Sequence, residues 1–394
     1  MISVEVHFNL NRILLLAIGL WPYQKSKFSQ LQIILCFCIL TSSVVFQFTA
    51  LITTKCTTDF TIKICSTAMF FSFYIINYNM FWINTHNVRN LLEQLQYTCN
   101  ELKDENELAI IKKYGNYTKL CTAIVTLFAM CTIVLAILLP IWPQILSIVL
   151  HINESRIQNQ VTQITTEYFV DQKKYFCLIL LHINTVICIG ATTLTATGTM
   201  LLGCAIHACG LFRIASYRME QIMTIEILQD INLKNRTVIC NKIFYAVEIH
   251  RKAMKFTNIL IATFQGSLLL LIAIIVISLS LNIFAIYRNA SLGNTEAVLL
   301  HFIFIFTFLL YSFVGNYIGE ELCNHSNHIY STTYNSRWYK APLYAQKMIL
   351  FILQRGSQVS DINIAGLFIP SLECFATLTK ASMSYFTVLY SMQQ

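Results

Sequence analysis

Residues 257–287 read TNILIATFQGSLLLLIAIIVISLSLNIFAIY, and this stretch identifies the kind of protein. It contains no Asp, Glu, Lys or Arg, and it is longer than the roughly 20 apolar residues that a membrane-spanning helix needs. The whole chain has the same character, since 56% of its 394 residues are hydrophobic and 12% are charged. A soluble domain carries about 25% charged residues. The composition therefore indicates an integral membrane protein and argues against a disordered chain or a soluble enzyme.

Further stretches of this kind predict an all-α protein with seven membrane-spanning helices. No Gly/Ser-rich linker, repeat or low-complexity tract divides the chain, so we expect a single domain over residues 1–394. The N-terminal segment has no small-residue cleavage site after an apolar run, and no removable signal peptide is expected. The predicted spans are approximately 31–52, 62–84, 118–140, 175–202, 257–287, 297–319 and 372–392.

The distribution of Lys and Arg predicts a cytoplasmic N-terminus. With that orientation, the inside segments hold 20 basic residues and the outside segments hold 6, while Lys380 lies within the last span. An odd number of spans then places the C-terminus outside the cell. This orientation is the inverse of that of a G-protein-coupled receptor, and the Asp-Arg-Tyr and Asn-Pro-x-x-Tyr signatures of that class are missing from the sequence.

Two glycosylation sequons fall in predicted outside loops, at Asn153 and Asn289. Asn116, Asn235 and Asn324 match the same pattern on the predicted inside, where they could not be modified. The pattern alone therefore does not decide which sequons are used.

The chain between the fourth and fifth spans predicts helices that continue below the membrane. From Cys204 to Phe256 it runs for 53 residues without a proline. Its apolar residues recur at helical spacings, as Ile239 and Ile243 do, which is typical of amphipathic helices. A loop that contains only some helix is the alternative. A further helix at about 342–354 is too short to span and is expected beneath the membrane, before the last span.

The longest outside connection runs from Ile141 to Lys174 and mixes apolar with polar residues. Such a segment can fold back over the bundle as a lid, or it can be a solvated loop with no role in binding. The sequence leaves both interpretations open.

Most of the 14 cysteines lie in or beside apolar runs, where a free thiol behaves as a small apolar side chain. Cys204, His207 and Cys209 are close in sequence, but their spacing fits no standard zinc pattern and no second cluster accompanies them. No metal site and no cofactor are therefore expected. No Asp or Glu lies deep in any predicted span, which argues against a transporter or a membrane enzyme.

The last span carries a stripe of small and polar residues along one side. Phe375, Leu378, Phe386 and Leu389 point towards its other faces. A polar stripe on a spanning helix faces a water-filled path or buried partners, and ordinary Ser/Thr packing between helices is the alternative. The stripe consists of Thr377, Lys380, Ala381, Ser384, Val388, Ser391 and Met392.

Two stretches of the carboxy-terminal third read YSFVGNYIGEELCNHSNHIYSTTYNSRWY (311–339) and QRGSQVSDINIAGLFIPSLECFATLTKASMSYFTVLYS (354–391). They resemble the insect odorant receptor family. LLHINTVICIGATTLTATGTM (180–200) and HACGLFRIASYRME (207–220) further resemble the receptors of ants, bees and wasps. The matching positions are Tyr311, Gly315, Gly319, Glu320, Ser326, Tyr334, Trp338, Arg355, Ala365, Gly366, Ser371, Phe375, Ser384, Tyr385 and Phe386.

The likeness is strongest in the last third, and the first 200 residues agree mainly in the layout of the spans. The family's frequent Tyr-Cys pair of the sixth span is Tyr311-Ser312 here. The long intracellular insertion of the family's obligate co-receptor is missing, so the resemblance implies a ligand-tuning subunit. A gustatory-type receptor channel is the nearest alternative, and a seven-helix G-protein-coupled receptor is a more distant one.

The resemblance implies a tetrameric, odorant-gated, non-selective cation channel. The chain would form it with the co-receptor, as a heterotetramer in the plasma membrane of olfactory sensory neurons, with no enzymatic activity and no nucleic-acid partner. The seventh helices would surround the pore. Val388 and Met392 lie one turn apart, and apolar rings of this kind close a pore by excluding water. Ser391 and Ser384 would line the path beside them.

The resemblance also implies that packing of the cytoplasmic helix extensions holds the subunits together. Ile243 and Val247 are the apolar residues expected in that contact, with Tyr334 and Trp338 nearby. A charged substitution at either apolar position should then impair assembly.

Each subunit would bind one small apolar odorant or cuticular-type molecule in a concave, mostly aromatic and aliphatic pocket. The pocket is expected within the second, third, fourth and sixth spans, as in the family. For any single residue, plain packing of the bundle is the alternative. The expected lining is Met69, Phe70, Phe73, Tyr74, Asn77, Met130, Val134, Leu138, Ile179, His182, Val186, Phe302, Ile305 and Phe306.

Overall fold

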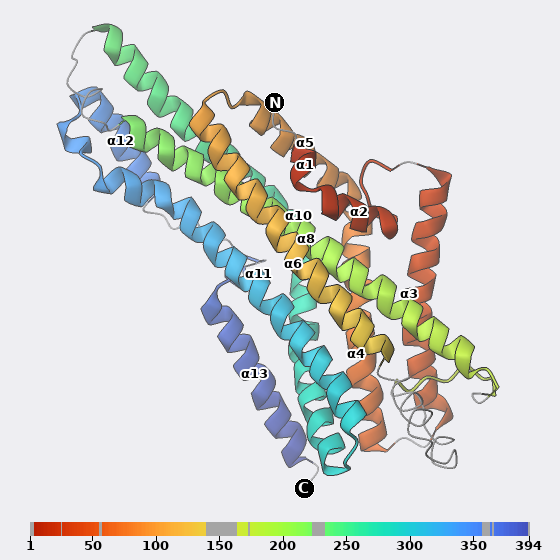
Figure 1. Cartoon of the computed structure of the whole chain (residues 1–394). Coiled ribbons are helices and arrows are strands. Elements are labelled where there is room, and N and C mark those ends of the chain that lie inside the picture. Colours follow the sequence, from red (N-terminus) through yellow and green to blue (C-terminus); the bar gives the residue numbers. More distant parts are fainter. Residues whose placement is uncertain are drawn as a thin grey trace.

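The chain folds into long α-helices, several of which extend well beyond the bundle at one end (Figure 1). The computed structural model describes residues 4–24, 26–54, 57–138, 164–171, 174–222, 233–356, 363–364 and 366–392. Among these residues there is no β-strand, apart from an isolated bridge between Ile364 and Phe368. The helices are α1 (Val4–His7), α2 (Asn9–Ala17), α3 (Lys27–Thr53), α4 (Thr58–Ile83), α5 (Thr85–Glu101), α6 (Glu105–Leu138), α8 (Phe176–Ile222), α10 (Leu233–Ser291), α11 (Thr295–Asn335), the 3-10 helix η2 (Trp338–Lys340), α12 (Leu343–Gly356) and α13 (Leu372–Ser391).

Six helices in the described ranges are long and apolar enough to cross a membrane, namely α3, α4, α6, α8, α10 and α11. The seventh helix of the bundle, α13, has 20 residues and carries both Glu373 and Lys380, so it is less apolar. The prediction of an all-α membrane protein with seven helices is confirmed. The N-terminal helices and the C-terminal end of α13 lie at opposite ends of the bundle (Figure 1). The end that holds α1, α5 and α12 is called the cytoplasmic end below, following the Lys and Arg distribution.

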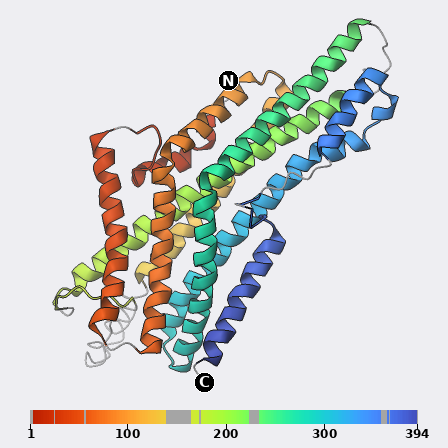
Figure 2. The same ribbon diagram turned by 180° about the vertical axis from the view of Figure 1, so that it is seen from behind.

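Three helices are far longer than a bilayer requires. α8 has 47 residues, α10 has 59 and α11 has 41. The predicted continuation of the fourth and fifth spans is confirmed, because α8 runs on to Ile222 and α10 already begins at Leu233. The short helix predicted at 342–354 is α12. Figure 2 shows the extended ends of α8, α10 and α11 lying together with α12, away from α3 and α4.

The centre of the bundle is α8, which packs on α2, α3, α4, α6, α10 and α11. Every residue from Gly203 to Phe212 on this helix is buried. Small residues in this run let neighbouring elements approach the backbone closely. A Cβ atom at Gly203, for example, would lie only 2.5 Å from the ring of Phe8. A helix surrounded by protein on all sides explains why this segment is apolar beyond the predicted membrane span.

The N-terminal helices α1 and α2 pack against α6 and α8, an arrangement that the sequence did not suggest. Asn11 on α2 is completely buried, and its side-chain amide donates to Thr199 Oγ1 at 2.8 Å. Thr122 on α6 donates to Asn11 Oδ1 at 3.3 Å. The ring of His7 contacts that of His207 with 3.3 Å between the facing nitrogens, and burial lowers the pKa of His7. The helices α1 and α2 are therefore part of the folded core.

A buried ion pair joins three helices near the cytoplasmic end. Arg218 on α8 donates to both carboxylate oxygens of Glu107 on α6, at 2.6 and 2.9 Å. Its third nitrogen donates to the backbone carbonyl of Tyr245 on α10 at 2.9 Å. A bidentate Arg–carboxylate pair fixes the relative orientation of its helices as well as their distance. The start of α6 is thereby locked onto the extensions of α8 and α10.

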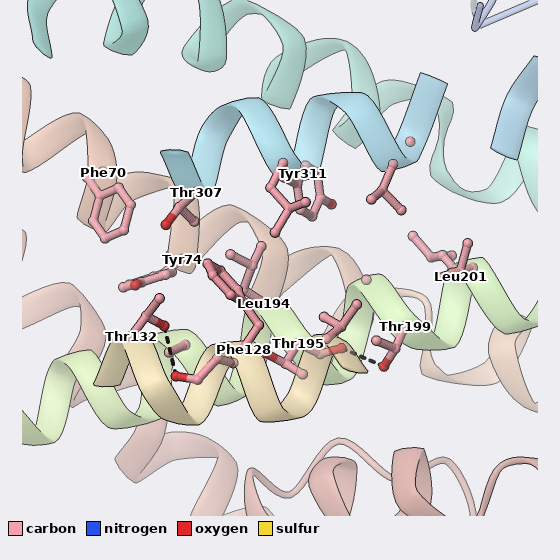
Figure 3. A pocket seen from close by; sticks show the side chains of 18 of the residues that line it. Phe70, Tyr74, Phe128, Thr132, Leu194, Thr195, Thr199, Leu201, Thr307 and Tyr311 are labelled. Atoms are coloured by element: carbon pink, nitrogen blue, oxygen red, sulfur yellow. Dashed lines mark hydrogen bonds between the residues drawn. The ribbon is translucent and has the colours of Figure 1, made fainter. Parts of the chain in front are cut away.

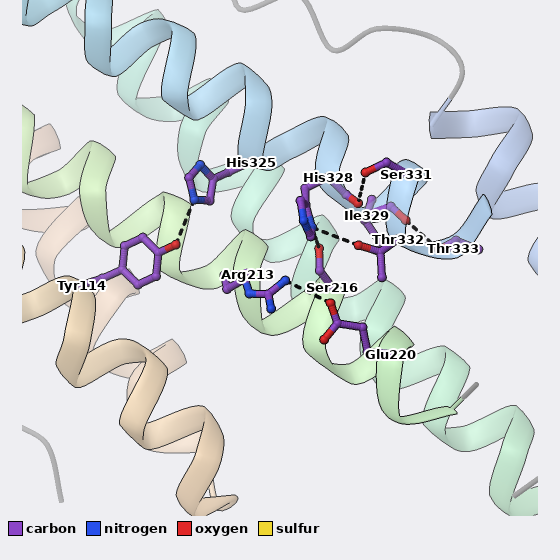
Figure 4. Close-up of polar contacts among 10 residues, drawn as sticks. All are labelled: Tyr114, Arg213, Ser216, Glu220, His325, His328, Ile329, Ser331, Thr332 and Thr333. Atoms are coloured by element: carbon purple, nitrogen blue, oxygen red, sulfur yellow. Dashed lines mark hydrogen bonds and ion pairs between the residues drawn. The ribbon is translucent and has the colours of Figure 1, made fainter. Parts of the chain in front are cut away.

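Polar contacts also hold α11 against α6 and α8 in this region (Figure 4). Tyr114 on α6 lies 2.9 Å from His325 Nε2, and Ser216 on α8 lies 3.0 Å from His328 Nδ1. Arg213 pairs with Glu220 along α8 itself at 3.1 Å. These contacts lie at the inner ends of the helices, so the cytoplasmic extensions form one connected unit.

The last helix is attached to α10 and α11 at two levels. Near its start, the backbone N–H of Leu372 donates to Glu320 Oε2 at 2.7 Å, and that of Ser371 donates to an amide oxygen of α11 at 3.3 Å. An anionic side chain at a helix N-terminus also complements the helix dipole. Further along, Ser280 on α10 donates to the backbone carbonyl of Ser382 at 2.9 Å. One face of α13 is thus fixed to its own subunit.

Candidate functional site

A cavity of about 270 Å³ lies inside the bundle, between α4, α6, α8, α10 and α11 (Figure 3). Its lining is dominated by aliphatic and aromatic side chains. The residues are Phe70 and Tyr74 on α4; Val125, Phe128, Ala129, Thr132, Ile133 and Ala136 on α6; Ile187, Ala191, Leu194, Thr195, Gly198, Thr199, Leu201, Leu202 and Ala205 on α8; Leu260, Ile261, Phe264 and Leu268 on α10; and Leu300, Ile303, Phe304, Thr307, Leu310, Tyr311, Val314, Gly315 and Ile318 on α11.

Stacked aromatic rings form the wall between α4 and α11. Phe70 stacks on Phe304 with ring centroids 3.9 Å apart, and it meets Phe308 edge-on at 5.4 Å. Tyr74 and Phe70 form a T-shaped pair with ring centroids 4.9 Å apart. Such pairs add to the stabilisation from burial and hold ring orientations. This wall is therefore a fixed boundary of the cavity.

Most hydroxyl groups around the cavity donate to groups of the protein itself. Thr132, Thr199 and Thr307 each donate to a backbone carbonyl of their own helix, at 2.8, 2.6 and 2.9 Å. Tyr311 donates to Asn77 Oδ1 at 3.0 Å. These donors are already used, so the space that they surround is suited to an apolar molecule.

Of the side chains expected in the pocket, Phe70 and Tyr74 line the cavity. Phe73, Asn77, Ile179 and Val186 are buried as packing residues but are not part of the lining. Asn77 contributes indirectly, because it holds the hydroxyl of Tyr311 and donates to the backbone of Phe73 at 2.9 Å. Met69 and Ile305 are half-buried and are not part of the lining.

Five other expected pocket residues point away from the cavity and, contrary to the expectation, do not line it. Met130, Val134, Leu138, Phe302 and Phe306 are between 42% and 58% exposed on the outer faces of α6 and α11. In a multi-pass membrane protein an exposed face of a spanning helix can meet lipid, so an apolar side chain there needs no partner within the subunit. Phe306 nevertheless contacts Phe128, a lining residue, with ring centroids 5.3 Å apart.

The expected pocket contained no residue of α10 and none from the inner half of α8. Leu260 and Phe264 on α10 line the cavity, as do Thr195 and Thr199 on α8. The small and hydroxylated residues ATTLTATG (191–198) were the available signal for the latter. Such residues allow close helix packing, but they also leave space where no neighbour fills it.

His182 is hydrogen-bonded on both ring nitrogens near the outer end of the bundle. Ser42 Oγ lies 3.0 Å from Nε2, and the hydroxyl of Tyr168 lies 2.8 Å from Nδ1. The backbone of Glu167 donates to Phe46 on α3 at 2.8 Å, which ties this part of the long outer connection to the bundle. The remainder of the predicted lid, including residues 139–163, lies outside the described residues. His182 is therefore a structural contact between α3, α8 and the segment 164–171.

The polar stripe of α13 faces away from its own subunit. Leu378 and Ser382 are buried against the bundle, and Phe375, Phe386 and Leu389 are half-buried on the same side. Val388 is 53% exposed and Met392 is 79% exposed. The predicted division of this helix into faces agrees with these exposures. The exposed stripe consists of Thr377, Lys380, Ser384, Val388, Ser391 and Met392, with Ala381 half-buried.

One of the expected subunit contacts needs correction. Ile243 is only 1% exposed, because its side chain packs within its own chain, and it is not available to a neighbour. Val247 and Tyr334 are exposed, at 37% and 60%, and Trp338 is half-buried. These three residues are accessible on the extensions at the cytoplasmic end.

The sequon residue Asn289 lies in the last turn of α10 and donates to the carbonyl of Ala285 at 2.7 Å. Asn153 lies outside the described residues.

Within the described part of the chain, no three His, Cys, Asp or Glu side chains converge on a point that could hold a metal ion. His207 contacts the carbonyl of Gly203 at 2.8 Å.

These features define a multi-pass α-helical membrane protein with an internal apolar cavity. Residues 53–383 match the 7tm Odorant receptor family, and the chain belongs to that family. It is 26% identical over 200 residues to odorant receptor 22c of Drosophila melanogaster. That match covers 49% of this chain and 47% of the relative, so the chain spans about half the length of the curated relative it matches.

The fold is also similar to solved structures of the insect olfactory receptor OR5 from Machilis hrabei. The structure in complex with eugenol has a TM-score of 0.77 and 15% sequence identity, covering 99% of this chain and 97% of the other. A second structure of the same receptor has a TM-score of 0.72 and 16% identity, covering 98% and 97%. At these identities the likeness establishes the fold.

Proposed function

We propose that this chain is the ligand-tuning subunit of an odorant-gated, non-selective cation channel, formed with a co-receptor in the plasma membrane of olfactory sensory neurons. The observation that carries the proposal is the combination of two features in one chain. An apolar cavity lies within the bundle, and α13 presents a polar stripe to the outside of the subunit. The first feature suits a small apolar ligand and the second suits a shared water-filled path.

The ligand is a small, mainly apolar odorant. Ligand pockets typically measure about 300–1,000 Å³. The cavity, at about 270 Å³, lies just below that range, which favours a compact odorant over a long cuticular-type molecule. Because most lining hydroxyls are bonded within the protein, shape and apolar contact would dominate recognition.

The pore would be lined by the stripe of α13. Val388 and Met392 form its constriction, and Ser384 and Ser391 supply polar lining. Apolar rings close a pore by excluding water, and a ligand opens it only by binding the open state more tightly than the closed one. Val247, Tyr334 and Trp338 would contribute to packing between subunits.

The test is a recording of odorant-evoked current from cells that express this chain with and without the co-receptor. Cysteine substitutions at Ser384, Val388, Ser391 and Met392 are then exposed to a water-soluble thiol reagent. Current should respond at these positions, whereas cysteines at the inward-facing Phe386 and Leu389 serve as matched controls. Modification with no preference between the two faces would contradict the pore assignment. The lack of any odorant-evoked current in the presence of the co-receptor would contradict the proposed function.

A further inference from the structure

Gly190 lies on α8 directly behind Tyr74, a residue that lines the cavity. It is buried, and it is not part of the lining itself. A Cβ atom at this position would lie 2.0, 2.4 and 2.5 Å from Cδ2, Cε2 and Cγ of Tyr74. These ring atoms are close to the backbone of α4, so a small rotation of a flexible chain end cannot relieve the overlap. The ring of Tyr74 therefore occupies space that any other residue at position 190 would need.

The ring of Tyr74 has little room to move except into the cavity. Phe70 and Phe71 each form a T-shaped pair with it, with ring centroids 4.9 and 6.0 Å away. Phe70 is itself stacked on Phe304 at 3.9 Å. Close-packed rings transmit a displacement instead of absorbing it. To reach an ordinary contact of about 3.4 Å with a new Cβ atom, the ring must move by roughly 1.4 Å, away from α8.

We propose that Gly190 is a positioning residue for ligand specificity, because it lets Tyr74 pack against the backbone of α8 and thereby sets the width of the cavity. A side chain at this position would push the ring into the cavity and exclude the bulkier apolar ligands, those with a ring or a branched chain. The proposal rests on the proposed function only in taking this cavity as the odorant site. The geometry that it uses lies entirely within one subunit.

Gly198 provides a matched comparison on the same helix. It lines the cavity directly, and a Cβ atom there would lie 3.6 Å from the ring of Tyr311, an ordinary contact. Gly198→Ala therefore adds a methyl group to the same cavity without displacing a ring. Gly190→Ala adds the same group outside the lining and narrows the cavity only through Tyr74.

The experiment measures cavity width without needing a known odorant. Thr307→Cys places a thiol in the lining, at the same end of the cavity as Tyr74 and Phe70 (Figure 3). The full-length chain, in membranes with the co-receptor, is treated with methyl or benzyl methanethiosulfonate. Peptide-resolved mass spectrometry gives the labelling rate at position 307 and separates it from the native cysteines. The readout is the ratio of the benzyl rate to the methyl rate.

Gly190→Ala should lower that ratio by about tenfold, as expected of an overpacked site. Gly198→Ala should change it by less than about twofold. In a Tyr74→Ala background, Gly190→Ala should leave the ratio unchanged, because the ring that it would displace is gone. An unchanged ratio in Gly190→Ala, or an equal fall in both alanine variants, would overturn the proposal.

Folding itself provides a second readout. If Gly190→Ala does not reach the membrane but its combination with Tyr74→Ala does, the contact is supported. If neither reaches the membrane, the clash is with something other than Tyr74 and the proposal fails. Concentration–response curves for C6–C12 alcohols and aldehydes then test tuning in cells with the co-receptor. A labelling effect without any odorant current would leave the cavity geometry in place and refute the proposed function instead.

Discussion

Replacing Glu107 with glutamine should destabilise this protein far more than a comparable change at its surface. The carboxylate accepts two hydrogen bonds from Arg218, and the two side chains are only 7% and 22% exposed. Glutamine keeps the size of the side chain but removes its charge. Its amide nitrogen would also face the guanidinium N–H groups, and because both groups are hydrogen-bond donors, no hydrogen bond can form between them. The guanidinium would then stay in place without its counter-charge.

The expected cost is about 3 kcal/mol. Removing one partner of a buried pair costs about 3–5 kcal/mol, and the partial exposure of Arg218 places this pair at the lower end. With an unfolding entropy of about 2.1 cal/mol/K per residue, such a loss in a chain of 394 residues lowers the melting temperature by roughly 4 °C. Because three helices meet at Arg218, we also expect less assembled receptor.

The assay is the apparent melting temperature of the detergent-solubilised receptor, followed by size-exclusion chromatography. Glu93→Gln is the matched control. It removes the same charge from an i,i+4 pair with Arg89 on α5, whose side chains are 50% and 38% exposed. Such exposed pairs contribute little. If Glu107→Gln lowers the melting temperature no more than Glu93→Gln does, the buried pair does not stabilise the junction and the reasoning is wrong.

Tyr311→Phe should leave the buried oxygen of Asn77 without its donor, at a cost of about 1–3 kcal/mol. Thermal stability and the odorant concentration for half-maximal current should both change, and the absence of a change in both would contradict this prediction. Ser280→Ala removes the donor to the backbone of α13 and should raise current without ligand. Ser382→Ala leaves that backbone carbonyl intact and should have no such effect, so equal leak in both variants would exclude the tether. Gly319→Ala would place a Cβ atom 2.3 Å from a proline of the connector before α13, and surface labelling should therefore fall; wild-type surface levels would show that the connector can shift.

The helices themselves could be predicted from the sequence because burial in lipid requires them. Backbone polar groups in a bilayer must be paired within each segment, so a long apolar stretch such as residues 257–287 has to be helical. The absence of proline from Cys204 to Phe256 likewise predicted that α8 and α10 continue beyond the membrane. The buried Asn11 and the packing of α1 and α2 gave no such signal, because helices of four and nine residues are too short for their pattern to indicate which helices they pack against.

The candidate site was predictable only in part, and Phe302 and Phe304 illustrate why. Both are aromatic residues on α11, two positions apart. Phe302 is 58% exposed on the outer face, whereas Phe304 is 4% exposed and lines the cavity. In a soluble protein, an apolar face indicates the interior. In a bilayer, the outer face is apolar as well, so hydrophobicity does not separate lipid contact from cavity lining.

The sequence by itself determined the number and order of the spanning helices and the polar stripe of α13, because these follow from hydrophobic length and helical period along one chain. The tertiary structure alone decided which side chains surround the cavity and that Ile243 is internal. It also decided that Tyr74 rests against Gly190. Each of these depends on the rotation of one helix against another, and that rotation is fixed by side-chain packing between residues more than one hundred positions apart, as Tyr74 and Gly190 are.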